Sequence, residues 1–243
     1  MPFRLLDLDG VANYLHLTPA DIEQRVKNRE IPFEKRGVRI VFRKSEIDAW
    51  ASQHILGLPG QQLAVYHQKS TRQTRKILPH ETIMPELLRS GAVAPAMTSK
   101  TRASVLRDLV ALAEKTGNLG DPKALLASLE AREKLCSTAV PGGFALPHPR
   151  SHEPYLFVTS FIVVGRPVQE IHFGAPDGQP TRLFFLVCCQ NDRLHLHTLA
   201  RVCLLALKTR LLDLLREAPD AETMRHSIIA AEQEVLADRN IVS

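Results

Sequence analysis

The sequence has few cysteines, and they lack the spacing of metal-binding or disulfide pairs. The four are Cys136, Cys188, Cys189 and Cys203, and no two of them form a CxxC motif. Cys188 and Cys189 are adjacent within an apolar run, which favours small buried thiols in a reducing compartment over a disulfide framework. This pattern excludes a zinc ribbon and a secreted disulfide scaffold.

Long hydrophobic runs are also missing. The longest apolar stretches, near residues 155–164 and 183–189, are about half a membrane span or less. Asp7 and Asp9 lie where a signal peptide would need an apolar segment. The chain has 243 residues, of which 44% are hydrophobic and 23% charged. We therefore expect a cytoplasmic globular protein of one or two domains with no membrane partner.

Charge is distributed unevenly along the chain. Residues 1–80 hold 13 basic and 8 acidic side chains, whereas residues 81–243 hold 18 of each. The stretch 57–80 has four basic residues and no acid. A local basic surplus favours an anionic partner such as nucleic acid, and a solvated basic linker is the simpler alternative.

The N-terminal quarter predicts two helices, a hairpin and a third helix. After a short helix over residues 8–14, Thr18-Pro19 provides an N-cap and a proline at the first helical position, opening a helix through about Asn28. Residues 33–42 alternate around Gly37 as in a hairpin, and residues 45–54 form a helix with the only tryptophan, Trp50. Such a helix-turn-helix with a wing can place its second helix in a DNA major groove.

Polar and basic side chains on the second helix and the wing are candidates for DNA contact. The residues that we predict to contact DNA are Gln24, Arg25, Lys27, Lys35, Arg36, Arg39 and Arg43. Asp21 and Glu23, near the start of the same helix, would repel phosphates.

This region resembles the excisionase-type, MerR-like winged helix over about residues 4–55. The resemblance rests on the run Leu8–Leu15, Thr18, Ile31-Pro32, the hairpin glycine and Ile47–Trp50. It implies sequence-specific DNA binding, with a vestigial or protein-binding winged helix as the alternative, and winged helices of this type often act as homodimers. The family usually has glycine where Arg29 stands, at a helix end where positive φ is common.

The rest of the chain predicts a linker and an α/β domain. From residue 57 to residue 80 periodicity vanishes and Gly, Pro, Gln, Ser and Thr dominate, as in a linker. The predicted organisation is a winged helix over 1–56, a basic linker over 57–80 and a larger domain over 81–243. In that domain we expect helices over 99–116, 121–134, 194–209, 211–217 and 221–236, and strands over 144–146, 157–164, 171–173 and 183–189.

The densest chemical signal lies at the start of the predicted strands. Arg132 ends a helix, Ser137-Thr138 and a Gly-rich bend follow, and His148 comes directly after a short strand and a proline. A histidine fixed at a strand end is placed as a nucleophile must be. An arginine nearby could bind phosphoryl oxygens, and a second histidine could orient the first, for which His195 and His197 at the start of a helix are candidates.

The string from Arg132-Glu133 through Ser-Thr to Ala145-Leu146-Pro147-His148 resembles enzyme IIA domains of the fructose/mannitol class of the bacterial phosphotransferase system. That class includes the nitrogen-regulatory enzyme IIA, and the resemblance covers about residues 80–236. It implies a mixed sheet flanked by helices and an HPr-like phosphocarrier as phosphoryl donor. By position, His148 is the phosphoryl acceptor, Arg132 and His195 are its catalytic partners, and Ser137 and Thr138 are the supporting hydroxyl pair. Pro149 departs from the usual glycine and removes a main-chain N–H that could bind phosphate.

Two alternatives to this site stay open. The histidines at 148, 152, 195 and 197 could form a zinc site, but no Cys or acid lies at a supporting spacing, so we expect no metal and no cofactor. A degenerate domain could also keep the fold without the chemistry.

The leading hypothesis is a bacterial regulator of transcription, with nitrogen regulation as one of its expected roles. In this hypothesis, phosphorylation of His148 alters the binding of DNA or of regulatory proteins. The alternative is a DNA-binding transcription factor whose enzyme IIA-like domain is a non-catalytic sensor or dimerisation module. A third hypothesis is a regulator that acts on other proteins by contact alone.

Overall fold

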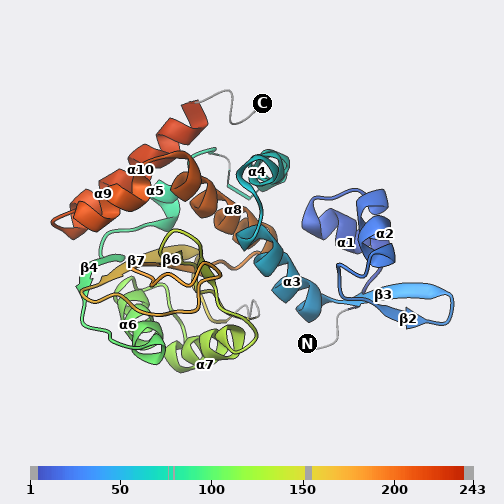
Figure 1. Ribbon diagram of the computed structural model, residues 1–243, viewed down its shortest axis with the longest axis horizontal. Helices are drawn as coiled ribbons and strands as arrows, with labels where there is room; N and C mark the ends of the chain where they lie inside the picture. The colour runs from blue at the N-terminus through green and yellow to red at the C-terminus, as the bar shows by residue number, and fades with distance from the viewer. Residues whose placement is uncertain (1–4, 76, 79, 151–154, 238–243) are drawn as a thin grey trace. The chain divides into compact units, whose positions relative to one another are not determined.

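The chain divides into two compact units, Met1–Leu58 and Pro59–Ser243. The computed structural model, drawn in Figure 1, describes residues 5–75, 77–78, 80–150 and 155–237. None of the helices in these ranges is long and apolar enough to cross a membrane.

The first unit is a helix-turn-helix followed by a hairpin and a longer helix. Its elements are β1 (Leu5–Leu6), α1 (Leu8–Leu15), α2 (Pro19–Lys27), β2 (Glu34–Arg36), β3 (Arg39–Arg43) and α3 (Lys44–Leu56). β3 pairs antiparallel with both β1 and β2. The two strands of the wing, β3 and β2, are therefore the middle strand and one edge strand of a three-stranded sheet. Val11, Ile22, Phe42 and Ile47 have no exposed surface and form the core.

Local signals explain where α2 begins and ends. Thr18 caps the helix and forms a capping box with Asp21, so the acid at the helix start satisfies the Thr18 backbone N–H. After the helix, Arg29 has a φ of 59°, the left-handed conformation that glycine adopts most easily. The chain thus keeps, with an arginine, the backbone conformation for which the winged-helix family usually has glycine.

The second unit is a five-stranded mixed sheet covered by helices on both faces. In spatial order the strands are β4 (Val93–Met97), β7 (Phe161–Pro167), β8 (Leu183–Cys188), β6 (Phe144–Ala145) and β5 (Ala139–Val140). β7 and β8 run antiparallel, whereas β4 is parallel to β7 and β6 is parallel to β8. The predicted α/β class with a mixed sheet is thus confirmed.

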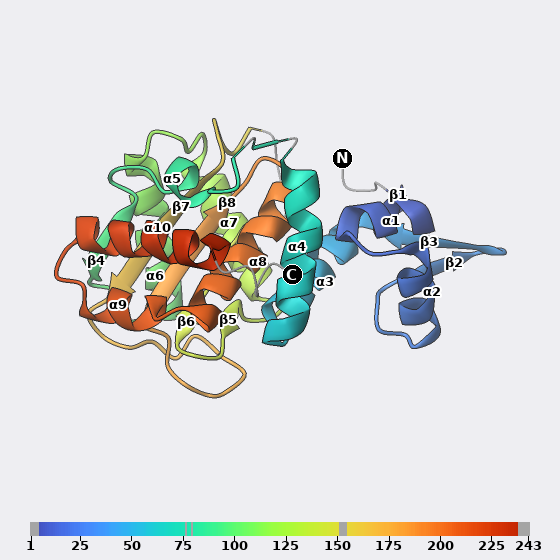
Figure 2. The ribbon, with the colours of Figure 1, turned by 90° about the horizontal axis from the view of Figure 1, so that it is seen from above.

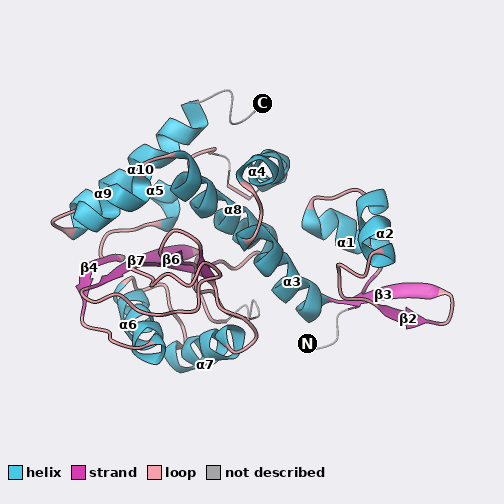
Figure 3. Cartoon of the chain, in the orientation of Figure 1, coloured by secondary structure: helices cyan, strands magenta, loops and turns pink. Residues whose placement is uncertain are grey.

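Two helical layers enclose this sheet. The helices are α4 (Gly60–Thr74), α5 (Met84–Leu87), α6 (Arg102–Lys115), α7 (Pro122–Glu133), α8 (Asp192–Lys208), α9 (Leu211–Glu217) and α10 (Ala221–Ala237). Figure 3 shows α6 and α7 on one face of the magenta strands and α8, α9 and α10 on the other. All six residues of β8 are buried, as expected for a strand covered on both faces.

The segment predicted to be an irregular linker, residues 57–80, instead contains α4, a helix of 15 residues. Figure 2 shows α4 lying beside α8 within the second unit. Its buried positions include Leu63, His67, Ser70 and Thr74, which follow helical spacing. Most of these side chains are polar, and therefore the hydrophobic periodicity that predicts a helix is missing from the sequence.

Other elements differ in detail from the prediction. β4, β5 and α5 were not predicted, and β7 begins at Phe161 rather than at residue 157. The strand expected over residues 171–173 is reduced to a single bridge between Ile171 and Thr181. The four cysteines are free thiols, and Cys188, Cys189 and Cys203 are buried.

Candidate functional site

The site begins at His148, in the segment that leaves β6. The amide of Val187 in β8 donates to the Pro147 carbonyl at 2.9 Å, which fixes this segment against the sheet. The Nδ1 atom of His148 lies 2.8 Å from the carbonyl oxygen of Leu146. A carbonyl can only accept a hydrogen bond, so Nδ1 carries the proton and Nε2 keeps its lone pair. The neutral ring thus has its nucleophilic nitrogen at Nε2.

Arg132 meets this nitrogen from the C-terminal turn of α7. Its Nε donates to Nε2 of His148 at 3.0 Å, and its Nη1 donates to the carbonyl oxygen of Cys136, also at 3.0 Å. The side chain is only 1% exposed, and its Nη2 has no hydrogen-bond partner among the described residues. Arg132 also makes no ion pair within that part of the chain. A buried guanidinium with an unused donor and no carboxylate partner is suited to binding an anion.

The third predicted residue, His195, lies on the first turn of α8. Asn191 caps this helix by accepting hydrogen bonds from the amides of Arg193 and Leu194. The ring centroids of His148 and His195 are 4.9 Å apart, with an angle of 55° between the rings. The topology explains why the two rings lie close together. β6 and β8 are parallel, so the residues that follow them, including His148 and His195, lie at the same end of the sheet.

Ser137 and Thr138 lie in the turn between α7 and β5, and their hydroxyl groups already make hydrogen bonds to neighbouring residues. The Ser137 hydroxyl donates to the Phe173 carbonyl at 2.6 Å and accepts from the Ala139 amide at 3.1 Å. Thr138 donates its backbone N–H and its hydroxyl to the carboxylate of Glu133. The two hydroxyl groups therefore shape the turn, and their predicted support of a phosphoryl group stays a prediction.

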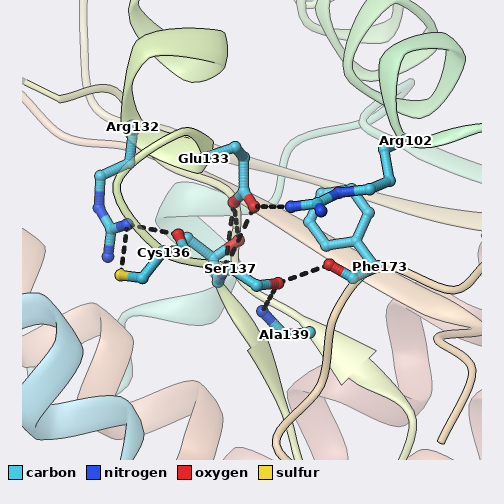
Figure 4. Close-up of polar contacts among 8 residues, drawn as sticks. Arg102, Arg132, Glu133, Cys136, Ser137, Ala139 and Phe173 are labelled. Atoms are coloured by element: carbon cyan, nitrogen blue, oxygen red, sulfur yellow. Dashed lines mark hydrogen bonds and ion pairs between the residues drawn. The ribbon is translucent and has the colours of Figure 1, made fainter. Parts of the chain in front are cut away.

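Glu133 was not among the predicted site residues. Figure 4 shows it turned away from Arg132, its neighbour in sequence, and toward Arg102 of α6. The distance from Arg102 Nη2 to Glu133 Oε2 is 3.4 Å. Burial raises the pKa of Glu133, although hydrogen bonds from Thr138 oppose this effect. The Arg-Glu pair followed by Ser-Thr was the sequence signal that could have identified it.

Cys136 is a second residue that the sequence did not bring to the site. Its Sγ lies 3.3 Å from Nη1 of Arg132, so one guanidinium contacts both this thiol and His148. Figure 4 shows the sulfur beside the Arg132 side chain.

The histidines considered for a zinc site have different surroundings. No group of three or more His, Cys, Asp or Glu side chains suited to a metal occurs in the ranges that the structure describes. His152 lies outside the described residues. His197 faces a different set of partners from His195, since its Nδ1 lies 2.7 Å from the Ser70 hydroxyl of α4.

The residues predicted to contact DNA fall into two groups. Arg25 is engaged inside the first unit, where its guanidinium lies 5.5 Å from the Trp50 ring centroid and pairs with Glu30 at 3.6 Å. Arg36 and Arg43 both pair with Glu34. The remaining four, which are Gln24, Lys27, Lys35 and Arg39, are exposed. Lys35 and Arg39, on the wing, make no ion pair with any described residue.

Residues 86–231, more than half of the chain, match the family described as "Phosphoenolpyruvate-dependent sugar phosphotransferase system, EIIA 2". The chain belongs to this family. Residues 5–54 match a second family, described as "Helix-turn-helix domain". We therefore refer to the second unit as the EIIA 2 unit and to the first as the helix-turn-helix unit.

Curated relatives of the EIIA 2 unit include regulatory and transport proteins. The "Nitrogen regulatory protein" of Bradyrhizobium diazoefficiens is 32% identical over 148 residues, which are 60% of this chain and 93% of the relative. The "PTS system fructose-specific EIIABC component" of Bacillus subtilis is 26% identical over 141 residues. That match covers 57% of this chain but only 22% of the relative.

Solved structures share the fold of the EIIA 2 unit. The nitrogen regulatory protein IIA-Ntr from Neisseria meningitidis superposes with a TM-score of 0.51 at 24% identity, covering 59% of this chain and 97% of that structure. IIA mannitol from Escherichia coli gives a TM-score of 0.52 at 16% identity, with coverages of 58% and 98%. α4 lies outside the residues that match the family. The roles of Arg132, His148 and His195 in chemistry stay predictions.

Proposed function

We propose that the EIIA 2 unit accepts a phosphoryl group on Nε2 of His148 from a phosphorylated HPr-like carrier, and that phosphorylation controls the helix-turn-helix unit or protein partners. The observation that carries the proposal is the arrangement of one ring between two groups. The Leu146 carbonyl holds the proton on Nδ1, and Arg132 lies at Nε2. This arrangement selects Nε2 as the nucleophile.

The transfer follows from these contacts. Nε2 attacks the phosphorus of the carrier's phosphohistidine, a new N–P bond forms, and the N–P bond to the carrier breaks. Arg132 releases Nε2 as the phosphorus approaches and turns its donors, including the unused Nη2, to the phosphoryl oxygens. The Nδ1 proton remains on the ring, stabilised by the Leu146 carbonyl as positive charge develops. His195 orients the ring or donates a hydrogen bond.

Burial sets a condition on this reaction. His148 and His195 are each 2% exposed. A carrier protein must therefore bring its phosphoryl group to a nearly buried nitrogen that Arg132 already contacts. Pro149 lacks an N–H, so the residue after the nucleophile offers no main-chain donor to the phosphoryl oxygens.

Intact mass spectrometry after incubation with phosphoenolpyruvate, enzyme I and HPr tests the proposal. Wild type is expected to gain one acid-labile phosphoryl group, and His148→Asn is expected to gain none. His172→Asn, at an exposed histidine, is the matched control and should behave as wild type. Arg132→Ala should slow the transfer about 10²- to 10³-fold, as loss of a preorganised donor does. A wild-type rate in Arg132→Ala would show that its assigned role is wrong.

A DNA-binding regulator with a non-catalytic EIIA 2 unit is the second candidate, favoured by the unpaired charges of the wing. Phosphate contacts make affinity fall steeply with salt, and each lost contact lowers the salt slope by about one. The double variant Lys35→Gln/Arg39→Gln should reduce affinity and salt slope together. Lys123→Gln/Arg107→Gln removes the same charge from the surface of the EIIA 2 unit and should change neither. If His148→Asn binds DNA as wild type does under phosphorylating conditions, this second function is favoured.

Control of other proteins by contact is tested with the same variants. Partners captured in proportion to His148 phosphorylation, with no DNA bound, would assign the function to protein contact alone.

A further inference from the structure

A recess of about 470 Å³ lies at the edge of the sheet away from His148. β7 and β8 run antiparallel, so the last residues of β7 and the first of β8 lie at the end opposite both active-site histidines. Arg166, Arg182 and Arg216 line the recess together with one acid, Glu170. Figure 2 shows α9, the helix of Arg216, at the same end of the unit as β4.

An irregularity in β4 lies beside this recess, since Pro95 and Ala96 line it. Ala94 pairs with Gly165 and Met97 pairs with Pro167, so two residues of β4 oppose the single residue Arg166. A bulge of this kind bends the strand and re-aims the side chains beside it, and bulges are frequent near functional sites. Pro95, inside the bulge, turns its carbonyl to the Nε of Arg166 at 2.8 Å.

Arg166 is a fixed positive charge with only neutral partners. Besides the Pro95 carbonyl, its Nη1 donates to the carbonyls of Leu215 and Arg216, at 2.7 and 2.8 Å. These carbonyls belong to the end of α9, and they hold the half-buried guanidinium in place. No carboxylate of a described residue pairs with it. A half-buried, unneutralised guanidinium is favourable for an incoming anion.

The other two arginines are tethered but accessible. Arg182 pairs with Glu170, and the two side chains are 54% and 40% exposed. Arg216, 31% exposed, donates to Asp213 at 2.8 Å and to the Gly142 carbonyl at 2.6 Å. Exposed ion pairs of this kind contribute at most about 1 kcal/mol, so both guanidinium groups can turn toward a stronger acceptor.

We propose that this recess binds a small anionic molecule with at least two phosphate or carboxylate groups. Three guanidinium groups, set against Glu170 and against the Asp213 carboxylate that pairs with Arg216, leave a net charge of about +1, which favours an anion. Arginine forks bind carboxylate and phosphate in the same bidentate geometry. A volume of about 470 Å³ is that of a small-molecule site. The site is distinct from the His148 site and does not depend on the proposed function.

Titration of the ¹⁵N-labelled full chain with inorganic pyrophosphate, and separately with citrate, tests the proposal in chloride buffer at about 0.15 M ionic strength. Saturating amide shifts are expected at Val168, which lines the recess, at Gly165, which precedes Arg166, and at Gly143, which lies beside the Arg216 guanidinium. Arg182→Gln/Arg216→Gln should weaken binding at least about tenfold, as loss of two charge-assisted contacts predicts. The control Arg107→Gln/Lys123→Gln has the same change of net charge at exposed positions and should retain wild-type affinity.

Three results would overturn the proposal. The first is the absence of saturating shifts at the recess with either anion, and the second is shifts confined to residues around His148. The third is equal weakening by the control variant, because net charge alone would then explain binding. Saturation by pyrophosphate alone would support the phosphate arm, and saturation by citrate alone the carboxylate arm.

Discussion

Acid should loosen α4 from the EIIA 2 unit by protonating His67. This side chain is 3% exposed, and its Nε2 accepts the Nε–H of Arg201 at 2.7 Å. It also stacks on His197, with ring centroids 4.8 Å apart. Burial, followed by the positive charge of Arg201, lowers the pKa of His67 from 6.5 to about 3. A protonated ring has no lone pair for Arg201 and would place a second cation against it.

The sign and size of the effect follow from this pKa. The pKa is lower in the folded state than in the unfolded state, so the neutral ring favours folding above pH 6.5. That contribution is lost as the pH falls from 6.5 toward 3. Each pH unit below 6.5 removes about 1.36 kcal/mol from the free energy of unfolding, so about 2 kcal/mol should be lost at pH 5. Glu232 acts in the opposite direction, because burial raises its pKa, and a comparison with a variant is therefore needed.

Hydrogen exchange of the backbone of residues 60–74, corrected for intrinsic rates, measures this loss. A change of about 2 kcal/mol makes exchange about 30-fold faster at pH 5 than at pH 7. In His67→Gln the amide oxygen can still accept from Arg201 but cannot titrate, so its exchange should be nearly independent of pH. His172→Gln, at an exposed histidine, should follow wild type. Equal pH dependence in wild type and His67→Gln would refute the reasoning.

Three further predictions concern stability. Glu232→Gln leaves the fully buried guanidinium of Arg201 without its carboxylate, and urea unfolding should report a loss of about 3 to 5 kcal/mol; a loss below 1 kcal/mol would contradict a buried ion pair. Arg29→Gly relieves a φ of 59° and should stabilise the helix-turn-helix unit by about 1 kcal/mol, measured by thermal unfolding through Trp50 fluorescence. Gly165→Ala places a Cβ 2.5 Å from the Met97 sulfur and should cost about 1 to 3 kcal/mol in urea unfolding; unchanged stability would show that the Met97 side chain moves aside without cost.

Sequence patterns predicted most of the fold where apolar residues carry the packing. The amphipathic run with Leu109 and Leu112 predicted α6, and the continuous apolar run of β8 predicted a strand, which the structure places in the middle of the sheet. The pattern failed at α4, since its buried stripe is formed by hydrogen-bonding side chains. It failed at β4 because Pro95 is typical of an interrupted strand, and the structure uses it at a bulge on the sheet edge.

The candidate site was predictable to the level of which residues meet. The resemblance to enzyme IIA domains predicted that Arg132, His148 and His195 share a site, and the structure places both Arg132 and His195 against His148. The proton position on His148 was not predictable, because it depends on a main-chain carbonyl two residues away. The engagement of Arg25 by Trp50 was equally hidden, since it depends on how α2 packs on α3.

The buried polar side chains of α4, which are His67, Ser70 and Thr74, also determine where a stable fragment of the EIIA 2 unit can begin. A fragment that begins at residue 81, the predicted start of the larger domain, would lose the Ser70 hydroxyl beside His197 and the His67 ring beside Arg201, while Arg201 would keep Glu232. Those groups were buried against α4 and would face water, so α8 would lose packing on the face away from the sheet. A fragment that begins at Pro59 keeps α4 and its contacts with α8. We therefore expect the fragment that begins at residue 81 to unfold at a lower temperature than the fragment that begins at Pro59.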